Sequence, residues 1–436
     1  MNKRTLLLPA LAIATFCAAQ DDPYFPPITG EAWETMDPAS LGWCTDQMPA
    51  LLDFLEESNT KAFIVLKDGR IVIEHYFGTF TADSSWYWAS AGKSLTAFLV
   101  GLAQEDGLLD IDDATSEYLG TGWTSCTPEQ EAAITVRHQL TMTTGLDDGT
   151  SDLDCTDPAC LQYLAAPGTR WSYHNAPYTL LDGVLEEATG QNLNLYLYNN
   201  LTTATGITGL YIPVGDNNVF FSKPRSMARF GLLAQHHGVW TDIPVLGDAA
   251  YFTAMTTPSQ DLNPAYGYLW WLNGQSEFML PGPQFVFPGT LMPDAPQDAY
   301  NAMGKNGQVI NVSPVEGLVV VRMGDLPGGI FVPNVYNNQI WQHLNAVICS
   351  STGIDAPATT QGITLHPNPA TDALNISLPA GTIAGELRIV DAMGRVVSTK
   401  QVRSTTERMD LCDLAPGSYR CVLTTGNGRA VKGFVK

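Results

Sequence analysis

Short apolar runs occur in pairs near both ends of the region from residue 36 to residue 350. Near its start, Phe63–Leu66 and Ile71–Tyr76 are separated by a few turn residues. Near its end, Gln308–Val312 and Leu318–Arg322 are separated in the same way. Runs of β-branched and apolar residues around a short polar turn predict β-hairpins. We therefore expect antiparallel strands at both ends of this region.

Longer runs with helical spacing lie between and after these hairpins. Ser90–Gly101 continues as an apolar, helix-favouring stretch, Ala176–Thr189 is amphipathic, and Trp341–Ile348 predicts a closing helix. Gly190 directly follows the second run, which is typical of a helix end. Strands at both ends with helices between them predict an α/β (α+β) fold, in which helices flank one antiparallel sheet and a mostly helical region is inserted in the middle.

The pattern changes after residue 350. Ser350–Thr360 is rich in small residues and contains proline, which is typical of a linker. Beyond it, short strand-like runs such as Leu387–Val390 and Tyr419–Leu423 alternate with turn residues. We expect a linker at residues 351–361 and a small all-β module, a C-terminal β-sandwich, at residues 362–436.

The first residues have the composition of a secretory signal. A short basic start precedes the apolar run Leu6–Phe16, and small residues follow at Cys17–Ala19. The run is too short to cross a bilayer, and no later stretch offers the about 20 apolar residues of a transmembrane helix. We expect a signal peptide at residues 1–19 and a proline-rich N-terminal lead at residues 20–35, before the large domain at residues 36–350.

The formal net charge of −22 is unevenly spread. Residues 362–436 hold nine Lys/Arg and six Asp/Glu, whereas residues 20–361 hold 11 Lys/Arg and 38 Asp/Glu. Such an acidic surface repels nucleic acids and anionic membranes. We therefore expect no nucleic-acid partner.

A serine and a lysine three residues apart open the first helical run. Ser90 and Lys93 lie at the start of Trp88–Gly101, and residues i and i+3 share one face of a helix. A serine hydroxyl needs a neighbouring base to attack a carbonyl near pH 7, and a lysine in a partly desolvated pocket can lose its proton and serve as that base. We expect Ser90 to be a nucleophile and Lys93 its partner in proton transfer.

A second group of polar residues follows a turn at Pro167–Gly168. Tyr173 and Asn175 lie two apart and would point the same way on an extended backbone. A tyrosine hydroxyl beside a lysine ammonium can have its pKa lowered enough to relay a proton, and an amide can bind the carbonyl or the amide of a substrate. We expect Tyr173 to relay a proton and Asn175 to bind substrate, with His174 between them a spacer or a core histidine.

The S-x-x-K and Y-x-N motifs each occur elsewhere in the chain. The S-x-x-K spacing returns at Ser58 and Lys61, where it leads into the apolar run Ala62–Leu66 and predicts a buried strand in place of a helix. The Y-x-N spelling returns at Tyr198–Asn200 and Tyr336–Asn338, but without a turn before it and an amphipathic helix after it. Context therefore favours the first pair of motifs.

With these residues, the chain resembles the class C β-lactamase-related serine hydrolases, which include penicillin-binding proteins, esterases, D-aminopeptidases and 6-aminohexanoate-dimer hydrolases. The resemblance covers roughly residues 45–350 and implies an acyl-enzyme on Ser90, with Lys93 as its base or electrostatic partner, Tyr173 as the proton relay and Asn175 in substrate binding. The oxyanion hole would use the Ser90 N–H and a strand N–H. The matching segments, in order, are Ser90–Lys93, Ile134–Leu146, Pro167–Asn175, Ser226–Leu233 and Tyr266–Trp271.

One departure concerns the K-T-G (or H-x-G) triplet that members acting on β-lactams carry on the strand beside the nucleophile. Lys305–Gly307 imitates the triplet by letter, but counting back from the hairpin at Pro314 places it near Ala299–Asn301, which does not match. The resemblance therefore favours hydrolysis of an ester or amide over β-lactamase activity. We expect Lys305 and Asn306 to line the substrate site, with a plain surface turn as the alternative.

The C-terminal module resembles the sorting domain of the type IX secretion system of Bacteroidota. The resemblance implies passage through the periplasm and across the outer membrane by that machinery, followed by removal of the domain or attachment to the surface. An ordinary β-sandwich binding module is the alternative. The segments that carry the resemblance are Leu365–Ile376, Asp391–Arg395, Leu414–Tyr419 and Lys432–Lys436.

The cysteines are those of an exported protein, because disulfides form in oxidising compartments. None forms a C-x-x-C pair or lies in a cysteine/histidine cluster, so we expect neither a metal nor a cofactor. A Cys155–Cys160 bond would close a small loop. In the fold that the chain resembles, the first and last helices pack on the same side of the sheet, which implies a Cys44–Cys349 bond. Cys126 is the candidate for an unpaired thiol, and Cys412–Cys421 would bridge the C-terminal turn.

The sequence thus predicts a secreted serine hydrolase that cleaves an ester or amide bond of a small molecule or peptide. A catalytically inactive, penicillin-binding-like binding protein is the alternative, although the presence of all four expected site residues argues against loss of activity. A Ser-His-Asp hydrolase is a third class, but Trp88 stands where the G-x-S-x-G motif needs its first glycine.

Overall fold

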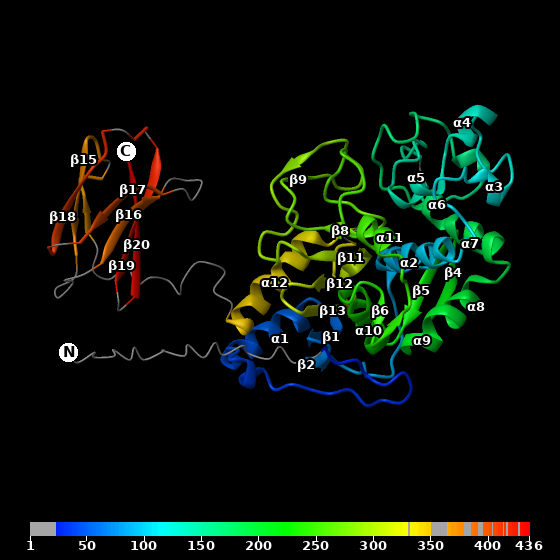
Figure 1. The fold of residues 1–436 in the computed structure, drawn as a ribbon, viewed down its shortest axis with the longest axis horizontal. Helices are drawn as coiled ribbons and strands as arrows, with labels where there is room; N and C mark the ends of the chain where they lie inside the picture. Colours follow the sequence, from blue (N-terminus) through cyan, green and yellow to red (C-terminus); the bar gives the residue numbers. More distant parts are fainter. Residues whose placement is uncertain are drawn as a thin grey trace, which may run out of the picture. The chain divides into compact units, whose positions relative to one another are not determined.

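The computed structural model describes two compact units, which divide after Ile348 (Figure 1). Residues 23–150, 152–329 and 332–349 are described, together with most of residues 364–436. In the C-terminal part the description omits residues 369, 379–384, 391–395, 403, 413, 416, 426 and 427. The expected signal peptide and linker therefore lie outside the described residues.

A six-stranded antiparallel sheet forms the centre of the larger unit. Its strand order is β2-β1-β13-β12-β11-β8, so that strands from the two ends of the unit meet in the middle. Both predicted hairpins are confirmed, and they join through the pairing of β1 with β13. The bounds are β1 Thr60–Lys67, β2 Arg70–Tyr76, β8 Trp271–Leu272, β11 Tyr300–Gly304, β12 Gln308–Ser313 and β13 Leu318–Gly324.

Helices cover both faces of this sheet (Figure 1). On one side α1 (Met48–Glu57) packs against α12 (Asn334–Ile348), and on the other α10 (Pro224–Gln235) lies across β1, β12 and β13. Gly231 lets α10 approach closely, because a Cβ there would lie 2.4 Å from Val319 Cγ1. The closing helix α12 begins seven residues before the predicted start at Trp341.

The central helix α2 (Gly92–Glu105) separates the sheet from the inserted helical region (Figure 1). It packs against α7, α11 and β11, and nearly all of its side chains are buried, which explains its apolar composition on every face. The predicted helix over 176–189 is interrupted at Leu180 and capped by Gly190. The other helices are α3 Ser116–Leu119, α4 Pro128–Ala132, α5 Val136–Leu140, α6 Asn175–Thr179, α7 Leu181–Thr189, α8 Leu193–Leu197, α9 Thr203–Thr205 and α11 Ala249–Met255.

Three small sheets complete the larger unit, and one of them leads directly into the start of α2. This sheet has the order β3-β5-β4, with β3 at Trp86–Tyr87, β5 at Asn217–Ser222 and β4 at Leu210–Val214. The others are the two-stranded pairs β6 (Val239–Trp240) with β7 (Ile243–Pro244) and β9 (Glu277–Phe278) with β10 (Phe287–Pro288).

The residues before 36 pack along the edge of the larger unit. The Tyr24 N–H donates to the Asp68 carbonyl over 3.0 Å, and the Arg229 guanidinium donates to the Pro27 carbonyl over 2.7 Å. Thr35 pairs with Ile71 of β2 in an isolated bridge. The proline-rich lead, from residue 23 onward, is therefore an ordered part of this unit.

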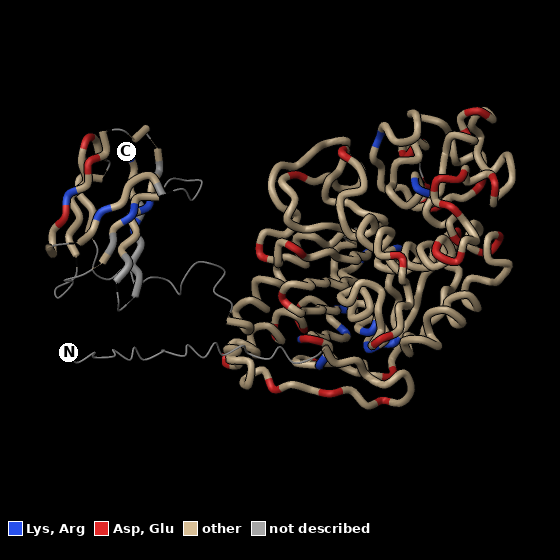
Figure 2. Tube along the Cα trace, viewed as in Figure 1, with Lys and Arg blue, Asp and Glu red and all other residues tan. Residues whose placement is uncertain are grey.

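Asp and Glu positions outnumber Lys and Arg positions along the chain trace of the larger unit (Figure 2). The acidic positions are frequent in the inserted region that carries α3, α4 and α7, where Lys and Arg are sparse. No helix in the described ranges has both the length and the apolar character needed to cross a membrane.

The C-terminal unit is a β-sandwich, as predicted. One sheet has the order β14-β15-β18 and the other β17-β16-β19-β20. Buried residues from both sheets, including Leu374 and Leu423, form one core. The Asp391–Arg395 segment lies outside the described residues. The bounds are β14 Thr364–His366, β15 Ala373–Ser377, β16 Glu386–Val390, β17 Val396–Gln401, β18 Thr406–Asp410, β19 Ser418–Thr425 and β20 Gly428–Val435.

The cysteine predictions are confirmed in part. Cys155 and Cys160 form a disulfide, and Cys126 is a free thiol. Cys44 and Cys349 are each disulfide-bonded, as their predicted pairing requires. The predicted Cys412–Cys421 bridge is wrong: both thiols are free, because Cys421 is buried in the sandwich core on β19 whereas Cys412 is exposed in a turn.

Candidate active site

Ser90 lies in a short 3-10 turn, Ala89–Ala91, directly between β3 and α2. The buried Trp88 anchors this turn, since its indole N–H donates to Ser222 Oγ over 2.7 Å and its backbone N–H to the Phe220 carbonyl over 2.8 Å. Ala89 has a φ of +47°, a conformation rare for residues other than glycine. The half-buried Ser90 hydroxyl is therefore presented by a rigid, partly strained turn.

Lys93 lies in the first turn of α2 and is only 3% exposed. Its Nζ lies 3.8 Å from the ring centroid of Tyr178 and 5.5 Å from that of Tyr173. Burial lowers the pKa of Lys93 to about 7, although the carboxylates of Asp154 and Asp182 favour its charged form. Near neutral pH a large fraction of Lys93 is thus an uncharged amine that can accept a proton.

Tyr173 is 9% exposed, and its hydroxyl interacts electrostatically with the side chain of Ser90. Its ring packs in an aromatic cluster with Trp171, Tyr266 and Trp271, and it stacks on Trp271 with 5.7 Å between ring centroids. Burial raises the pKa of Tyr173 well above 10, and the interaction with the Ser90 side chain only partly offsets this rise. The predicted lowering of this pKa is wrong, because a lysine that is itself partly neutral supplies little positive charge against desolvation.

Asn175 is the first residue of α6, and it follows an extended His174. Its Nδ2 donates to Asp154 Oδ1 over 2.7 Å. Its Oδ1 is buried and finds no hydrogen-bond partner among the described residues. His174 is 3% exposed, and burial lowers its pKa to about 4, which keeps it a neutral core histidine as expected.

The last residue of β11, Gly304, lies against the turn that carries the serine. A Cβ on Gly304 would lie 2.4 Å from the Trp88 carbonyl oxygen, 2.8 Å from the Ala91 nitrogen and 3.1 Å from the Ser90 nitrogen. Only glycine allows this approach of the two backbones. The strand position beside the serine is therefore Gly304, and the expectation of Ala299–Asn301 is wrong by several residues.

Lys305 and Asn306 follow in a short turn, Lys305–Gly307, with Asn306 at a φ of +63°. Asn306 Nδ2 donates to Tyr87 Oη over 2.9 Å and to Asp325 Oδ1 over 3.2 Å. The structure thus places both candidates beside the Ser90 turn, with Lys305 exposed and Asn306 tied to β3.

The other S-x-x-K and Y-x-N motifs in the chain lie in different structural environments from Ser90 and Tyr173. Ser58 Oγ lies 2.6 Å from Tyr336 Oη and donates to the Leu55 carbonyl over 3.0 Å, so that Ser58 and Tyr336 hold α12 against the end of α1. Tyr198 is 56% exposed. Neither of these repeated motifs brings a serine, a buried lysine and a tyrosine together.

The sequence-based prediction did not include three residues that act on Lys93: Tyr178, Asp154 and Asp182. Tyr178 could have been found, since it stands three residues after Asn175 on a predicted helix. The two carboxylates come from a loop and from α7, and no spacing links them to Lys93. In the described part of the chain, no group of three or more His, Cys, Asp and Glu side chains could hold a metal ion.

Residues 55–342 match the family model described as Beta-lactamase, and the chain belongs to this family of serine hydrolases. Residues 364–436 match the secretion system C-terminal sorting domain. This domain indicates export through the type IX secretion machinery to the cell surface or the medium.

Individual relatives are distant. An uncharacterized protein of Alkalihalophilus pseudofirmus is 23% identical over 309 residues, which cover 62% of this chain and 84% of the relative. The 6-aminohexanoate-dimer hydrolase of Paenarthrobacter ureafaciens is 33% identical over 73 residues, 17% of this chain and 19% of that enzyme. The crystal structure of a penicillin-binding protein homologue from Caulobacter crescentus superposes with a TM-score of 0.53 at 14% identity, covering 70% of this chain and 99% of that one. The structural likeness shows a shared fold.

Proposed function

We propose that the protein is a secreted serine hydrolase that cleaves an ester or amide bond through an acyl-enzyme on Ser90. The observation that carries this proposal is the grouping of three residues: Lys93 is buried and partly neutral one turn after Ser90 at the start of α2, and its Nζ lies 5.5 Å from the ring centroid of Tyr173. A nucleophile, a base and a hydroxyl relay are what acyl transfer requires.

In the proposed reaction the neutral Lys93 amine accepts the proton of Ser90 Oγ, which attacks the substrate carbonyl carbon. The negative charge that develops on the carbonyl oxygen is stabilised by the Ser90 N–H and an N–H at the end of β11, where Gly304 brings the two backbones together. Tyr173 passes a proton from Lys93 to the leaving alcohol or amine as the C–O or C–N bond breaks. Water then attacks the acyl group and gives its proton back through the same residues, which regenerates Ser90.

We propose neutral esters and amides as the substrate class. Two carboxylates, Asp154 and Asp182, act on the buried Lys93. Their negative charge disfavours a substrate selected by its own carboxylate. The partial match to a 6-aminohexanoate-dimer hydrolase supports including linear amides. Asn175, Lys305 and Asn306 are the proposed substrate-binding residues.

Covalent labelling with a fluorophosphonate, read by intact mass, tests the nucleophile. Wild-type protein should gain one adduct, and Ser90→Ala should gain none at an unchanged melting temperature. Ser58→Ala is the matched control, because it removes the serine of the other S-x-x-K pair and should still be labelled. An adduct that persists in Ser90→Ala would contradict the assignment, and an unlabelled wild type would favour the inactive binding protein.

A panel of p-nitrophenyl esters, D-amino-acid amides and nitrocefin separates the substrate classes. We expect turnover of esters or amides to exceed that of nitrocefin. Nitrocefin hydrolysis that exceeds turnover of every ester and amide would overturn the substrate class and leave the acyl-enzyme proposal standing.

A further inference from the structure

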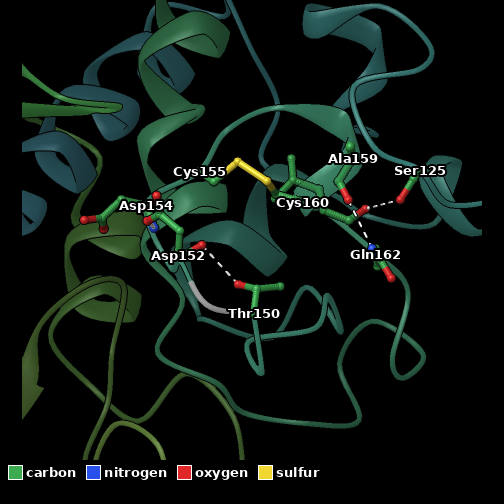
Figure 3. The surroundings of a disulfide bond; sticks show 9 residues. Ser125, Thr150, Asp152, Asp154, Cys155, Ala159, Cys160 and Gln162 are labelled. Carbon is green, nitrogen blue, oxygen red and sulfur yellow. Dashed lines mark hydrogen bonds between the residues drawn. A yellow bond between two sulfur atoms is a disulfide. The ribbon is translucent and has the colours of Figure 1, made fainter.

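A disulfide-closed loop lies next to the segment that carries Tyr173 and Asn175. The bond between Cys155 and Cys160 closes the loop, and Asp154 directly precedes it (Figure 3). Just before the loop, the Asp154 N–H donates to Asp152 Oδ1 over 3.0 Å, and within it the Cys160 N–H donates to the Asp157 carbonyl over 2.9 Å. These bonds fix the backbone on both sides of Asp154.

Two hydrogen bonds join this loop to the start of α6. The Ala176 N–H donates to the Leu153 carbonyl over 3.0 Å, and Asn175 Nδ2 donates to Asp154 Oδ1 over 2.7 Å. An ionised carboxylate only accepts hydrogen bonds, so it selects one of the two orientations of the Asn175 amide. The Nδ2 atom of Asn175 therefore binds Asp154. The buried Oδ1 atom accepts no hydrogen bond from the described residues and is left available to a substrate donor.

Four groups affect the charge of Lys93. The rings of Tyr173 and Tyr178 lie near Nζ, and the carboxylates of Asp154 and Asp182 favour the charged form, Asp154 more strongly. Asp182, on α7, accepts a hydrogen bond from Asn218 Nδ2 over 3.0 Å, and burial raises its own pKa to about 7. Near neutral pH Asp182 is therefore only partly ionised, and Asp154 has the larger of the two carboxylate effects on the charge of Lys93.

We propose that Asp154, held in place by the Cys155–Cys160 loop, is a positioning residue of the Ser90 site. It fixes the amide of Asn175 in one orientation, and its negative charge stabilises the ammonium of Lys93. It touches neither the serine nor the reacting bond. Its effect on turnover rests on the proposed function, whereas its effect on the charge state of Lys93 does not.

Two substitutions separate the roles of Asp154. Asp154→Asn keeps an acceptor for Asn175 Nδ2 but removes the charge, and Asp154→Ala removes both. Asp157→Asn is the matched control, because it removes one negative charge from an exposed position of the same loop. Melting temperatures show whether each variant is folded.

The charge role is read by NMR titration of a 13C-labelled Lys93 side chain in the full-length protein. We expect the midpoint of the Lys93 titration to be about half a pH unit lower in Asp154→Asn than in the wild type, since removing a nearby carboxylate disfavours the ammonium. Asp157→Asn should leave the midpoint in place. Equal midpoints in wild type and Asp154→Asn would overturn the charge role. Because titration needs no turnover, this result holds even if Ser90 proves not to be acylated.

The amide role is read from KM and kcat on the best substrate of the panel. Asp154→Ala should raise KM several-fold, and Asp154→Asn should recover most of that loss. The double variant Cys155→Ser/Cys160→Ser keeps every charge and should raise KM in the same direction. A KM of Asp154→Ala equal to that of Asp157→Asn would overturn the amide role. An unchanged KM in the double variant would remove the disulfide from the proposal.

Discussion

The charge of Lys93 is set by opposing influences at the scale of single residues. Burial favours the neutral amine, whereas the faces of Tyr173 and Tyr178 and the carboxylates of Asp154 and Asp182 favour the ammonium. The balance leaves a pKa of about 7, close to the value that serves a general base best near neutral pH.

The pH dependence of activity follows from this balance. We expect kcat/KM to rise as the pH is raised through about 7, because only the neutral Lys93 can accept the Ser90 proton. Lys93→Ala should lose activity by several orders of magnitude, since base and nucleophile act as a unit. A rate profile between pH 4 and 9 checks the first expectation, and a kcat/KM that is already at its plateau at pH 5 would contradict Lys93 as the base.

Tyr178 should contribute to the same balance through its ring. Tyr178→Leu removes the aromatic face 3.8 Å from Nζ, and the Lys93 midpoint should fall by roughly one pH unit if a buried cation–π contact contributes about 1–2 kcal/mol. Tyr178→Phe keeps the face and loses only the hydroxyl contact to Thr96, so its midpoint should stay near the wild-type value. Equal midpoints in the Leu and Phe variants would contradict a role for the ring.

At the scale of elements, the site depends on the contact between the end of β11 and the turn before α2. The two backbones approach so closely that no side chain fits at Gly304. The sheet thereby holds the strand N–H that the proposed oxyanion hole needs next to Ser90.

Gly304→Ala tests this contact. The added methyl group would overlap Trp88 and Ala91, so the strand must move away from the serine. A displacement of about 1 Å can cost about 100-fold in rate, and we expect a loss in kcat/KM of at least that size. Gly183→Ala on α7 is the control, because its methyl group meets only the end of the Leu119 side chain. Phosphonate labelling of Gly304→Ala at the wild-type rate would refute the role of this contact.

The elements differ in how far the sequence could predict them. The hairpins at residues 60–76 and 308–324 follow from short runs of apolar and β-branched residues around turn residues, and α2 from its apolar run. The position of Gly304 could not be counted from Pro314, because the residues of the intervening turn do not pair. Asp154 could not be assigned to Asn175 either, since 21 residues separate them and only tertiary packing brings them together.

At the scale of the whole molecule, two units carry different tasks. Patterning, charge and the two family matches all change near residue 350. We propose an N-terminal signal at residues 1–19, a hydrolase domain at residues 36–350, a linker at residues 351–361 and a sorting domain at residues 362–436. Residues 20–35 form a lead before the hydrolase domain, although Tyr24 and Pro27 already bond to it.

A shortened chain of residues 20–352 tests this division. It should fold, keep the Ser90 chemistry and lose only export or display, because separate cores behave independently. The cut must spare Cys349, which is disulfide-bonded, and the α12 helix. Labelling by fluorophosphonate and a melting curve compare it with the full-length chain. Insoluble or inactive protein would make the C-terminal unit part of the enzyme.

The aromatic cluster around Tyr173 has an optical consequence. Trp171 and Trp271 lie with ring centroids 6.4 Å and 5.7 Å from that of Tyr173, and the Ser90 side chain acts on the pKa of the Tyr173 hydroxyl. The proposed acylation of Ser90 would change the surroundings of Tyr173 and thereby those of both indoles. Intrinsic fluorescence should therefore change with each turnover, so that unlabelled natural compounds can be screened as substrates without a chromogenic leaving group.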